Sequence, residues 1–260
     1  MDFLLKEKII IVTGGAKGIG SGISRVLAAE GAIPVIVGRR EEDNNITVQS
    51  IIQSGGKADA VVAELTQPEE CKRAVDFVAK KYGRIDGLVN NAGINDGIGL
   101  AKGNYEDFML SLHRNLVHYY LMAHHALPLL IQSKGSILNI GSKTAETGQG
   151  NTSAYAAANG GRNALTREWA VELLPYNIRV NAIIVAESWT PLYENWIKTF
   201  SNPEEKIKSI VDKIPFENRM TTPEEIANMA AFLLSEKSSH TTGQLIHVDG
   251  GYVHLDRALS

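Results

Sequence analysis

Apolar runs of strand length alternate along the chain with segments of helical period. The runs predict strands at residues 9–13, 34–37, 60–62, 87–90, 136–140, 179–183 and 244–248. In the intervening segments apolar positions recur three and four residues apart. These segments predict helices at 19–30, 46–54, 68–82, 105–133, 152–174, 191–199 and 223–234. Because strands that are apolar throughout are buried on both faces, we predict an α/β fold with a Rossmann-type, doubly wound parallel sheet.

The composition is that of one globular domain spanning residues 1–260. The chain is 44% hydrophobic and 21% charged, with a formal net charge of −3, which is ordinary for such a domain. A chain of this length buries roughly 70–75% of its unfolded surface, so it needs no disulfide or metal for stability. The single cysteine, Cys71, and the lack of a Cys/His cluster at metal-ligand spacing predict a reducing compartment and no metal site.

The distribution of charge and hydrophobicity argues against several classes of partner. Residues 1–8 are charged and lack the order of a signal peptide. No apolar run approaches the roughly 18 residues that a membrane helix needs. The basic residues are dispersed rather than gathered into a nucleic-acid-binding surface. We therefore expect a cytoplasmic protein that binds neither membranes nor nucleic acid.

A glycine-rich turn, TGGAKGIG at 13–20, follows the first predicted strand and opens the first predicted helix. Gly14, Gly18 and Gly20 allow a tight turn and close approach of a pyrophosphate, which the N-terminus of the helix attracts. The alternative is a tight turn without a ligand. The surrounding strand–helix–strand order favours dinucleotide binding.

Tyr155 and Asn159 lie four residues apart in a segment predicted to be helical. Positions i and i+4 share one helix face, so a phenol there can exchange a proton with a substrate while its neighbour adjusts it. Ser142 supplies a hydroxyl just beyond the strand predicted at 136–140. Each side chain alone is more typical of a capping or core residue, but their joint order and spacing indicate an enzyme.

Motifs across essentially the whole chain resemble those of the short-chain dehydrogenase/reductase family. They are TGGAKGIG at 13–20, NNAG at 90–93, Asn115, Ser142, Tyr155, the Asn181-Ala182 strand end and the segment 243–251. Other stretches resemble the bacterial L-fucose dehydrogenases within that family. They are NDGIGL at 95–100, SKTA at 142–145, TGQGNTS at 147–153, TPLYENWI at 190–197 and VHLDRAL at 253–259. The resemblance implies hydride transfer between a nicotinamide and a sugar alcohol group.

The resemblance also implies a role for each residue of the catalytic group. Tyr155 would accept the hydroxyl proton, Ser142 would hold the oxygen, and Asn115 would support a water relay. In the family, a lysine four residues after the tyrosine favours the phenolate and binds the nicotinamide ribose. Here that position is Asn159, which can still hydrogen-bond the ribose but carries no charge.

The missing charge puts turnover in question. A change of one or two units in the pKa of a catalytic phenol corresponds to a rate loss of roughly 10- to 100-fold near neutrality. Lys143 is adjacent to Ser142, and Arg162 lies about 10 Å along the helix from Tyr155, which argues against direct contact. Both cations are better explained as structural or substrate-facing. An Asn159→Lys variant is therefore expected to gain at least about tenfold in rate.

The segment after the second strand predicts the choice of dinucleotide. An acidic residue there usually holds the ribose 2′-hydroxyl of NAD, whereas an arginine accommodates the 2′-phosphate of NADP. Gly38 stands at the acidic position and is followed by Arg39 and Arg40, so we predict NADP, with NAD as the alternative. The two arginines can also be a solvated pair answering the acidic residues at 41–43. The other predicted cofactor-binding residues are Gly14, Lys17, Gly18, Ile19, Gly20, Glu64, Leu65, Asn91, Ala92, Gly93 and Asn159.

Polar and aromatic side chains occur in loops expected at the carboxyl ends of the strands, where open α/β sheets bind ligands. The predicted substrate-binding residues are Asn95, Asp96, Lys143, Gln149, Glu187, Trp189 and Trp196. Any one of them can be a solvated loop residue. As a set they favour an aldose or polyol over a steroid or acyl chain, because carboxylates bind vicinal hydroxyls and indoles stack on pyranose rings.

The predicted function is oxidation of C1 of an aldose such as L-fucose to the lactone. Two alternatives stay open: a cofactor-binding protein silenced by Asn159, and a reductase of another carbonyl such as a 3-oxoacyl chain or keto-gluconate. The helices at 105–133 and 152–174 carry more apolar residues than one core-facing stripe needs, which predicts a homo-oligomer. The resemblance implies dimers paired into tetramers, with residues 253–259 reaching a neighbour.

Overall fold

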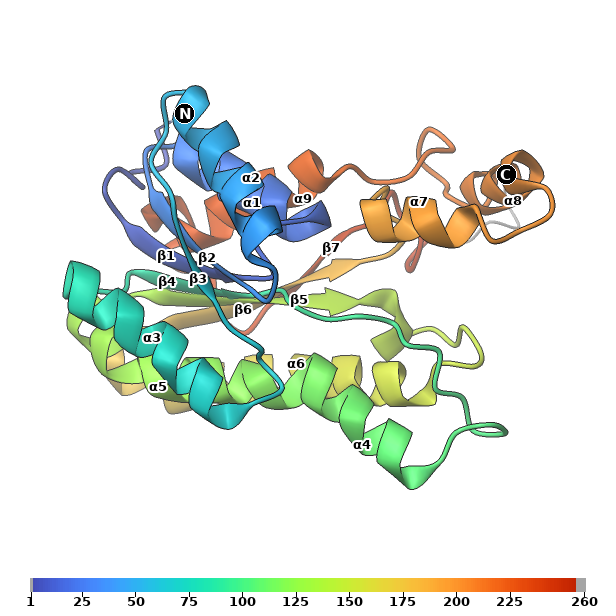
Figure 1. Ribbon diagram of the computed structural model, residues 1–260, viewed down its shortest axis with the longest axis horizontal. Helices are drawn as coiled ribbons and strands as arrows, with labels where there is room; N and C mark the ends of the chain where they lie inside the picture. The colour runs from blue at the N-terminus through green and yellow to red at the C-terminus, as the bar shows by residue number, and fades with distance from the viewer. Residues whose placement is uncertain (1, 256–260) are drawn as a thin grey trace.

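Seven parallel strands form one sheet in the computed structural model of the protein, which describes residues 2–255 (Figure 1). Their spatial order is β3-β2-β1-β4-β5-β6-β7. The strands are β1 Ile9–Thr13, β2 Ile33–Gly38, β3 Asp59–Val62, β4 Gly87–Asn90, β5 Ser136–Ser142, β6 Arg179–Val185 and β7 Leu245–Val248. Strands β1 and β4 are neighbours, so the chain reverses its direction of travel across the sheet between them. This order confirms the predicted doubly wound fold.

Helices cover both faces of the sheet (Figure 1). One face carries α1 (Gly18–Ala29), α2 (Glu41–Gln53) and α9 (Pro223–Leu234). The other carries α3 (Pro68–Tyr82), α4 (Tyr105–Leu112), α5 (His118–Ser133) and α6 (Ser153–Glu172). The central strands β1 and β4 are buried at every residue because both of their faces are covered. Across residues 2–255, no helix is both long and apolar enough to cross a membrane.

The single helix predicted over 105–133 is interrupted. A π-helical turn, η1 (His113–Val117), separates α4 from α5. A π turn widens the helix and shifts its ladder of hydrogen bonds, and such turns often occur at functional sites. Hydrophobic periodicity continues across the turn, which is why the pattern alone did not reveal it. Asn115 lies in the middle of η1 and is buried.

Smaller differences concern element ends and short helices. Helix α2 begins at Glu41 rather than at residue 46, because three acidic residues in its first turn stabilise the positive end of the helix dipole. Strands β5 and β6 each run two residues further than predicted. The short 3₁₀ helices are η2 (Lys143–Ala145), η3 (Leu174–Tyr176) and η4 (Glu236–Ser238).

Two helices follow β6 where one was predicted. Helix α7 (Pro191–Ile197) ends two residues earlier than expected, and α8 (Pro203–Val211) was missed. The start of α8 carries recognisable signals, since Pro203 is its first residue and the side chain of Asn202 accepts a hydrogen bond from the Glu205 amide. None of its residues is fully buried; its apolar residues at helical spacing, Ile207, Ile210 and Val211, are half-buried. Figure 1 shows both helices beyond the end of the sheet.

Candidate active site

The glycine turn lies where β1 and β4 end side by side, at the reversal point of the sheet. Gly14 has φ +64° and Gly18 has φ +53°, backbone conformations that favour glycine. A Cβ on Gly20 would overlap with the Gly14 carbonyl oxygen and lie 2.5 Å from Nδ2 of Asn91. Open α/β sheets bind ligands at this crevice. The bare backbone of the turn fits the close approach of a dinucleotide pyrophosphate.

The segment after β4 holds the glycine turn in place. Asn91 Nδ2 donates hydrogen bonds to the carbonyl oxygens of Thr13 (2.8 Å) and Gly14 (3.3 Å). The Thr13 hydroxyl accepts from the backbone amides of Asn91 (2.8 Å) and Ala92 (3.1 Å). Asn91 and Ala92 thus fix the shape of the turn, a contribution in addition to their predicted contact with cofactor.

The side chains predicted to bind the adenosine end of the cofactor differ in whether they already form contacts within the protein. Lys17 Nζ lies 2.8 Å and Arg40 Nε 3.4 Å from the Asp43 carboxylate, whereas Arg39 is exposed and no carboxylate in residues 2–255 lies within ion-pair distance of it. An oxygen of Glu64 accepts from the amide (3.1 Å) and hydroxyl (3.0 Å) of Thr66.

Two predicted cofactor-binding residues have apolar side chains that pack inward. Leu65 is buried in the core that β1 forms with α3 and α5. Ile19, in the first turn of α1, packs against the core on the opposite face of the sheet. Leu65 and Ile19 would therefore contact a cofactor through their backbone groups rather than through their side chains.

The predicted catalytic residues lie on packed elements. Ser142 ends β5, Tyr155 lies in the first turn of α6, and α6 packs against both β5 and η2. The Ser142 hydroxyl oxygen accepts from the amide (3.3 Å) and hydroxyl (3.1 Å) of Thr144. Tyr155 is half-buried, and Asn159, one turn further along α6, is fully buried.

The position of Arg162 relative to Tyr155 differs from the prediction made from the sequence. Its guanidinium carbon lies 5.9 Å from the centre of the Tyr155 ring and 4.3 Å from that of Tyr119. The predicted separation of about 10 Å applies to backbone positions. A long side chain on a helix leans toward the helix N-terminus, so Arg162 reaches back toward Tyr155. The expectation that the two do not come together is therefore wrong.

Arg162 is held by acceptors from three elements. Nε donates to the Asn115 carbonyl oxygen (2.6 Å), and Nη1 donates to the Ile140 carbonyl oxygen (3.0 Å) and to Oδ1 of Asn159 (3.0 Å). Nη2 lies 3.4 Å from Oδ1 of Asn115. Gly93 leaves room for this arrangement, because a Cβ there would lie 2.8 Å from Nη2. The guanidinium is 97% buried, since Arg162 is 3% exposed.

The side chains beside Arg162 on α5 are uncharged near neutral pH. Burial, together with the nearby Arg162 charge, lowers the pKa of His118 to about 3. Burial raises the pKa of the Tyr119 phenol, whose hydroxyl donates to the Ile140 carbonyl oxygen at 3.0 Å. Neither group therefore provides an anion for the guanidinium.

Acidification is expected to destabilise the fold through His118. Its folded pKa lies below the ordinary value of 6.5, so between those values the unfolded chain binds more protons and unfolding becomes easier as pH falls. The slope is about 1.4 kcal/mol per pH unit. Urea unfolding at pH 7 and pH 5 measures it. His118→Gln is expected to remove about 2 kcal/mol of the pH-dependent difference, whereas the exposed His124→Gln should leave it unchanged.

A polar cluster lies on the segments that follow β5 and β6. The Lys143 ammonium pairs with one oxygen of Glu187, and the Tyr193 hydroxyl donates to the other at 2.9 Å. The side chains of Lys143 and Glu187 are 9% and 14% exposed. The Lys143 ammonium also lies 4.0 Å from the centre of the Tyr252 ring. Two predicted substrate-binding residues are thus brought together, and two aromatic residues that sequence reasoning missed join them.

Aromatic rings continue from this cluster along α7. The Tyr193 ring centre lies 6.1 Å from that of Trp189 and 5.2 Å from that of Trp196. Trp196 also packs edge-on against Phe200 at 4.9 Å. Trp189 and Trp196 remain 41% and 44% exposed. Tyr193 and Trp196 lie three residues apart on α7, a spacing that places both on one helix face and was the available sequence signal for Tyr193.

Comparison with known proteins identifies the family. Residues 14–253 match a family described as enoyl-(acyl carrier protein) reductase. The chain is 36% identical over 250 residues to the 3-oxoacyl-[acyl-carrier-protein] reductase FabG of Thermotoga maritima, covering 96% of this chain and 99% of that protein. The chain belongs to the short-chain dehydrogenase/reductase family.

Two further relatives bear on the subgroup. The chain is 32% identical over 245 residues to the L-fucose dehydrogenase of Bos taurus, covering 94% of this chain and 88% of that protein. The crystal structure of Cj0485 dehydrogenase superposes with a TM-score of 0.95 at 47% identity, covering 100% of this chain and 99% of that one. This short-chain dehydrogenase/reductase is accordingly an oxidoreductase that acts on CH–OH or carbonyl groups, and dependence on NAD or NADP is typical of the family.

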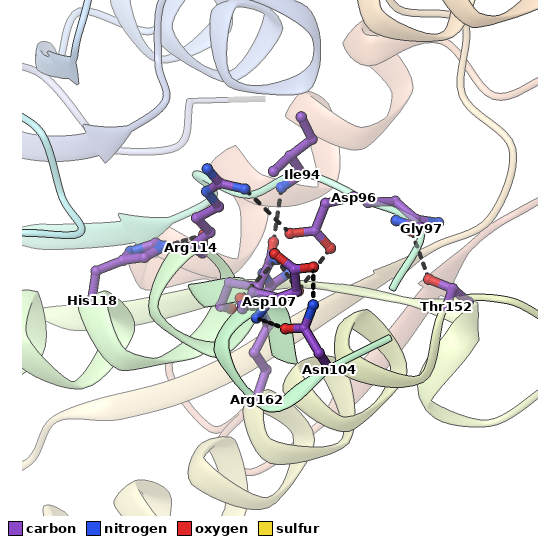
Figure 2. A network of polar contacts seen from close by, with 12 residues as sticks. Ile94, Asp96, Gly97, Asn104, Asp107, Arg114, His118, Thr152 and Arg162 are labelled. Atoms are coloured by element: carbon purple, nitrogen blue, oxygen red, sulfur yellow. Dashed lines mark hydrogen bonds and ion pairs between the residues drawn. The ribbon is translucent and has the colours of Figure 1, made fainter. Parts of the chain in front are cut away.

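The remaining predicted substrate residues differ in how freely they face solvent. Asp96 accepts from the Ser111 hydroxyl at 2.8 Å and lies 3.7 Å from Arg114 (Figure 2). Asn95 accepts from the Thr152 hydroxyl at 2.6 Å. In this short-chain dehydrogenase/reductase both side chains therefore fasten the loop after β4 to α4 and α6. Gln149 is exposed on the loop before α6.

Proposed function

We propose that this protein oxidises C1 of an aldose such as L-fucose to the lactone and transfers the hydride to NADP. The observation that carries the proposal is the nearly buried pair of Lys143 and Glu187, which the Tyr193 hydroxyl completes. These polar groups can exchange their mutual contacts for hydrogen bonds to ligand hydroxyls, whereas an apolar ligand would bury them without offering such bonds. The half-exposed indoles of Trp189 and Trp196 add flat apolar surfaces suited to a sugar ring.

The chain's own residues account for the steps around hydride transfer. The glycine turn and Asn91 would hold the pyrophosphate end of the cofactor, whose nicotinamide supplies the hydride acceptor. Ser142 holds the C1 oxygen of the sugar, and Tyr155 removes the hydroxyl proton as the C1–H bond breaks. The C1–O bond becomes the lactone carbonyl, and the proton resides on Tyr155 until solvent removes it.

The alternatives make different demands on the same surface. Reduction of a 3-oxoacyl chain, the reaction named for the Thermotoga maritima relative, calls for an apolar channel, and a buried ion pair beside it is unfavourable. A keto-gluconate would fit the polar cluster, so only assays separate it from an aldose. A silenced cofactor-binding protein would bind dinucleotide without turning over any of these substrates.

Steady-state kinetics distinguish these functions. L-Fucose, D-arabinose and L-galactose are tested with NADP and NAD, and a 3-oxoacyl thioester and a keto-gluconate are tested with the reduced cofactors. We expect sugar oxidation, and Glu187→Gln is expected to raise the KM for the sugar roughly 10- to 100-fold because it breaks a charge-assisted network. Glu194→Gln on the exposed surface of α7 is the matched control. Carbonyl reduction without sugar oxidation would contradict the proposal.

The preference for NADP is expected to depend on Arg39. A charge-assisted hydrogen bond to a 2′-phosphate contributes about 1.5–3 kcal/mol, so Arg39→Ala should lower kcat/KM for NADP roughly tenfold or more and leave NAD nearly unaffected. Arg73→Ala, which removes an exposed arginine from α3, is the control. An equal loss with both cofactors would show that Arg39 does not read the phosphate.

We also propose a homo-oligomer in the cytoplasm. Apolar side chains stand out on the helices of one face, including Tyr120 on α5 (52% exposed) and Val171 on α6 (67%). Covering them requires a second surface. The predicted tail at 253–259 lies partly outside the described residues. Sedimentation of the intact chain measures the oligomeric state, and a monomer would contradict this proposal.

A further inference from the structure

The Arg162 guanidinium is a buried cation that lacks an anionic partner. It is 3% exposed, and no carboxylate in residues 2–255 lies within ion-pair distance of it. Its neutral acceptors are carbonyl oxygens of Asn115 and Ile140 and the Asn159 amide. Burial of an uncompensated charge is strongly unfavourable. We therefore expect the charge of Arg162 to stabilise a neighbouring group, and the titratable residues around the guanidinium identify that group.

Each titratable group around the guanidinium can be assigned a charge. On α5, His118 and Tyr119 are neutral near pH 7, because burial lowers the pKa of the imidazole and raises that of the phenol. Lys143, the first residue of η2, is paired with Glu187. Arg114, on η1, is exposed and faces Asp96. Among the described residues, this leaves the half-buried phenol of Tyr155, with its ring centre 5.9 Å away, to become the counter-charge.

We propose that Arg162 is the positive charge that stabilises the Tyr155 phenolate, in place of the lysine that the family resemblance implies at position 159. This inference rests on the proposed role of Tyr155 as proton acceptor. The guanidinium carbon lies 5.9 Å from the centre of the Tyr155 ring, and a nearby opposite charge favours the ionised form of an acid. When the phenolate takes the substrate's hydroxyl proton it becomes a neutral phenol, and Arg162 keeps its own protons throughout. Arg162 is a positioning residue that acts through Tyr155.

The surrounding residues are arranged for this substitution. The Asn159 amide accepts from Arg162 Nη1 at 3.0 Å and donates to the Tyr155 carbonyl oxygen at 2.8 Å. A lysine ammonium at position 159 would lie against the guanidinium, whereas an amide supplies the acceptor that the guanidinium needs. Asn115, implied by resemblance to support a water relay, gives its carbonyl oxygen to Arg162 Nε instead. Asn159 and Arg162 thus form a matched pair.

This pairing reverses the expectation for Asn159→Lys. Two cations at hydrogen-bond distance repel each other, so the single variant is expected to lose activity rather than gain tenfold. The double variant Asn159→Lys with Arg162→Val restores one cation beside Tyr155 and is expected to recover at least about tenfold over Arg162→Val alone. A gain in the Asn159→Lys variant by itself would contradict the inference.

A substrate-free measurement separates this inference from the proposed function. The ultraviolet absorbance of ionised tyrosine is followed against pH in the native chain and in Arg162→Met, each referenced to the same chain carrying Tyr155→Phe. The Tyr155 phenolate is expected to appear at least about one pH unit higher without the arginine, and Arg162→Lys is expected to restore part of the difference. If the Tyr155 phenolate absorbance appears at the same pH in the native chain and in Arg162→Met, the inference is overturned, whatever sugar the enzyme oxidises.

Activity gives the second readout. The rate of oxidation by Arg162→Met is expected to rise with pH over a range displaced upward by the same amount, with cofactor affinity preserved. Thermal unfolding shows whether Arg162→Met is folded; if it is not, Arg162→Lys and the double variant decide by their pH profiles. A uniform loss of rate without displacement of the profile would mean a structural role only. Absence of sugar oxidation together with a displaced phenolate band would refute the proposed function and leave this inference standing.

A second, independent observation concerns Glu146, His247 and His254. One ligand atom from each lies within 4.8 Å of the others. His247 Nε2 is 3.0 Å from a Glu146 oxygen, and the two imidazole centres are 4.3 Å apart. They come from the loop after η2, from β7 and from the turn after β7. Two histidines and a carboxylate form a ligand set typical of Zn²⁺, with a fourth position open to water.

We infer that these three residues bind a divalent transition metal such as Zn²⁺. Ligand distances of about 2.0–2.1 Å require the donor atoms to close to roughly 3.3 Å from one another, which the exposed side chains of Glu146 and His254 can do by rotation toward His247. A bound ion would tie the loop that begins at Lys143 to β7. The expectation of no metal site rested on sequence spacing, which hides ligands that are far apart along the chain.

Calorimetric titration of the metal-stripped chain with ZnCl₂ tests the site. One equivalent is expected to bind, and His247→Ala or His254→Ala is expected to weaken binding at least about tenfold. His124→Ala, which removes an imidazole from the edge-to-face pair that His124 forms with His125 on α5, is the matched control. Absence of zinc binding, or equal binding by all four proteins, would overturn the inference and leave the Glu146–His247 contact as a hydrogen bond.

Discussion

Replacing Tyr155 by phenylalanine is expected to lower kcat by about 10²–10⁴-fold, the range that general acid–base groups contribute. The change removes one oxygen and leaves the ring beside Arg162, so cofactor affinity should change by less than about twofold. The reason is that the phenolic oxygen is the proposed acceptor of the substrate proton. Stopped-flow or steady-state measurement of cofactor reduction gives the rate, and cofactor fluorescence gives the affinity.

The matched control is Tyr176→Phe, which removes a hydroxyl from a 44% exposed ring on η3. It is expected to leave both quantities unchanged. If Tyr155→Phe retains more than about a tenth of the native rate, another group accepts the proton and the proposed mechanism is wrong. If it loses cofactor binding as well, Tyr155 has a structural role that the arrangement of α6 does not indicate.

Gly20→Ala is expected to have the second large effect, on cofactor binding and stability together. The added Cβ would overlap with the Gly14 carbonyl oxygen and lie 2.5 Å from Nδ2 of Asn91. Relief requires the glycine turn to move, which displaces the amides that would face a pyrophosphate. We expect at least about a tenfold loss of cofactor affinity and a decrease of about 1–3 kcal/mol in the free energy of unfolding. Cofactor titration and denaturant unfolding measure the two.

Gly160→Ala provides the comparison for this glycine. It lies inside α6, and a Cβ there would meet nothing within 4 Å. Alanine in a helix interior is more favourable than glycine by about 0.5–1 kcal/mol, so this variant is expected to be slightly more stable and to bind cofactor normally. Equal behaviour of the two variants would show that the glycine turn tolerates a side chain.

The path of the chain through the sheet could be predicted because the signals are local. Strand β1 is an unbroken apolar run, and α3 begins with Pro68 and ends before Gly83, which adopts φ +67°. Such runs and caps act through neighbouring residues, so a sequence displays them. The π turn at η1 was missed because its cause is not local. Asn115 contacts the Ile94 amide at 2.8 Å and Arg162 from α6, and those contacts come from distant segments.

The candidate site was predicted unevenly for the same reason. The order of the motifs located the glycine turn, Ser142 and Tyr155. The catalytic roles of Ser142 and Tyr155 remain predictions. Contacts between side chains were harder to predict. Lys143 and Glu187 were predicted as separate sugar-binding residues, but their ion pair and the hydrogen bond from Tyr193 to Glu187 were not predicted. Asp96 was expected to face substrate, whereas its carboxylate contacts Ser111 and Arg114.

The sequence by itself determined the fold class, the order of the strands and of most helices, the position of the glycine turn and the family, because these depend on hydrophobic period and short motifs. Only the tertiary structure decided what surrounds Tyr155. Asn159 read alone removes a charge, but the fold brings Arg162 back along α6 and seats it on acceptors from η1 and β5. The ionisation of a buried group depends on the charges and hydrogen bonds of every element packed around it, and those elements come together only when the chain has folded.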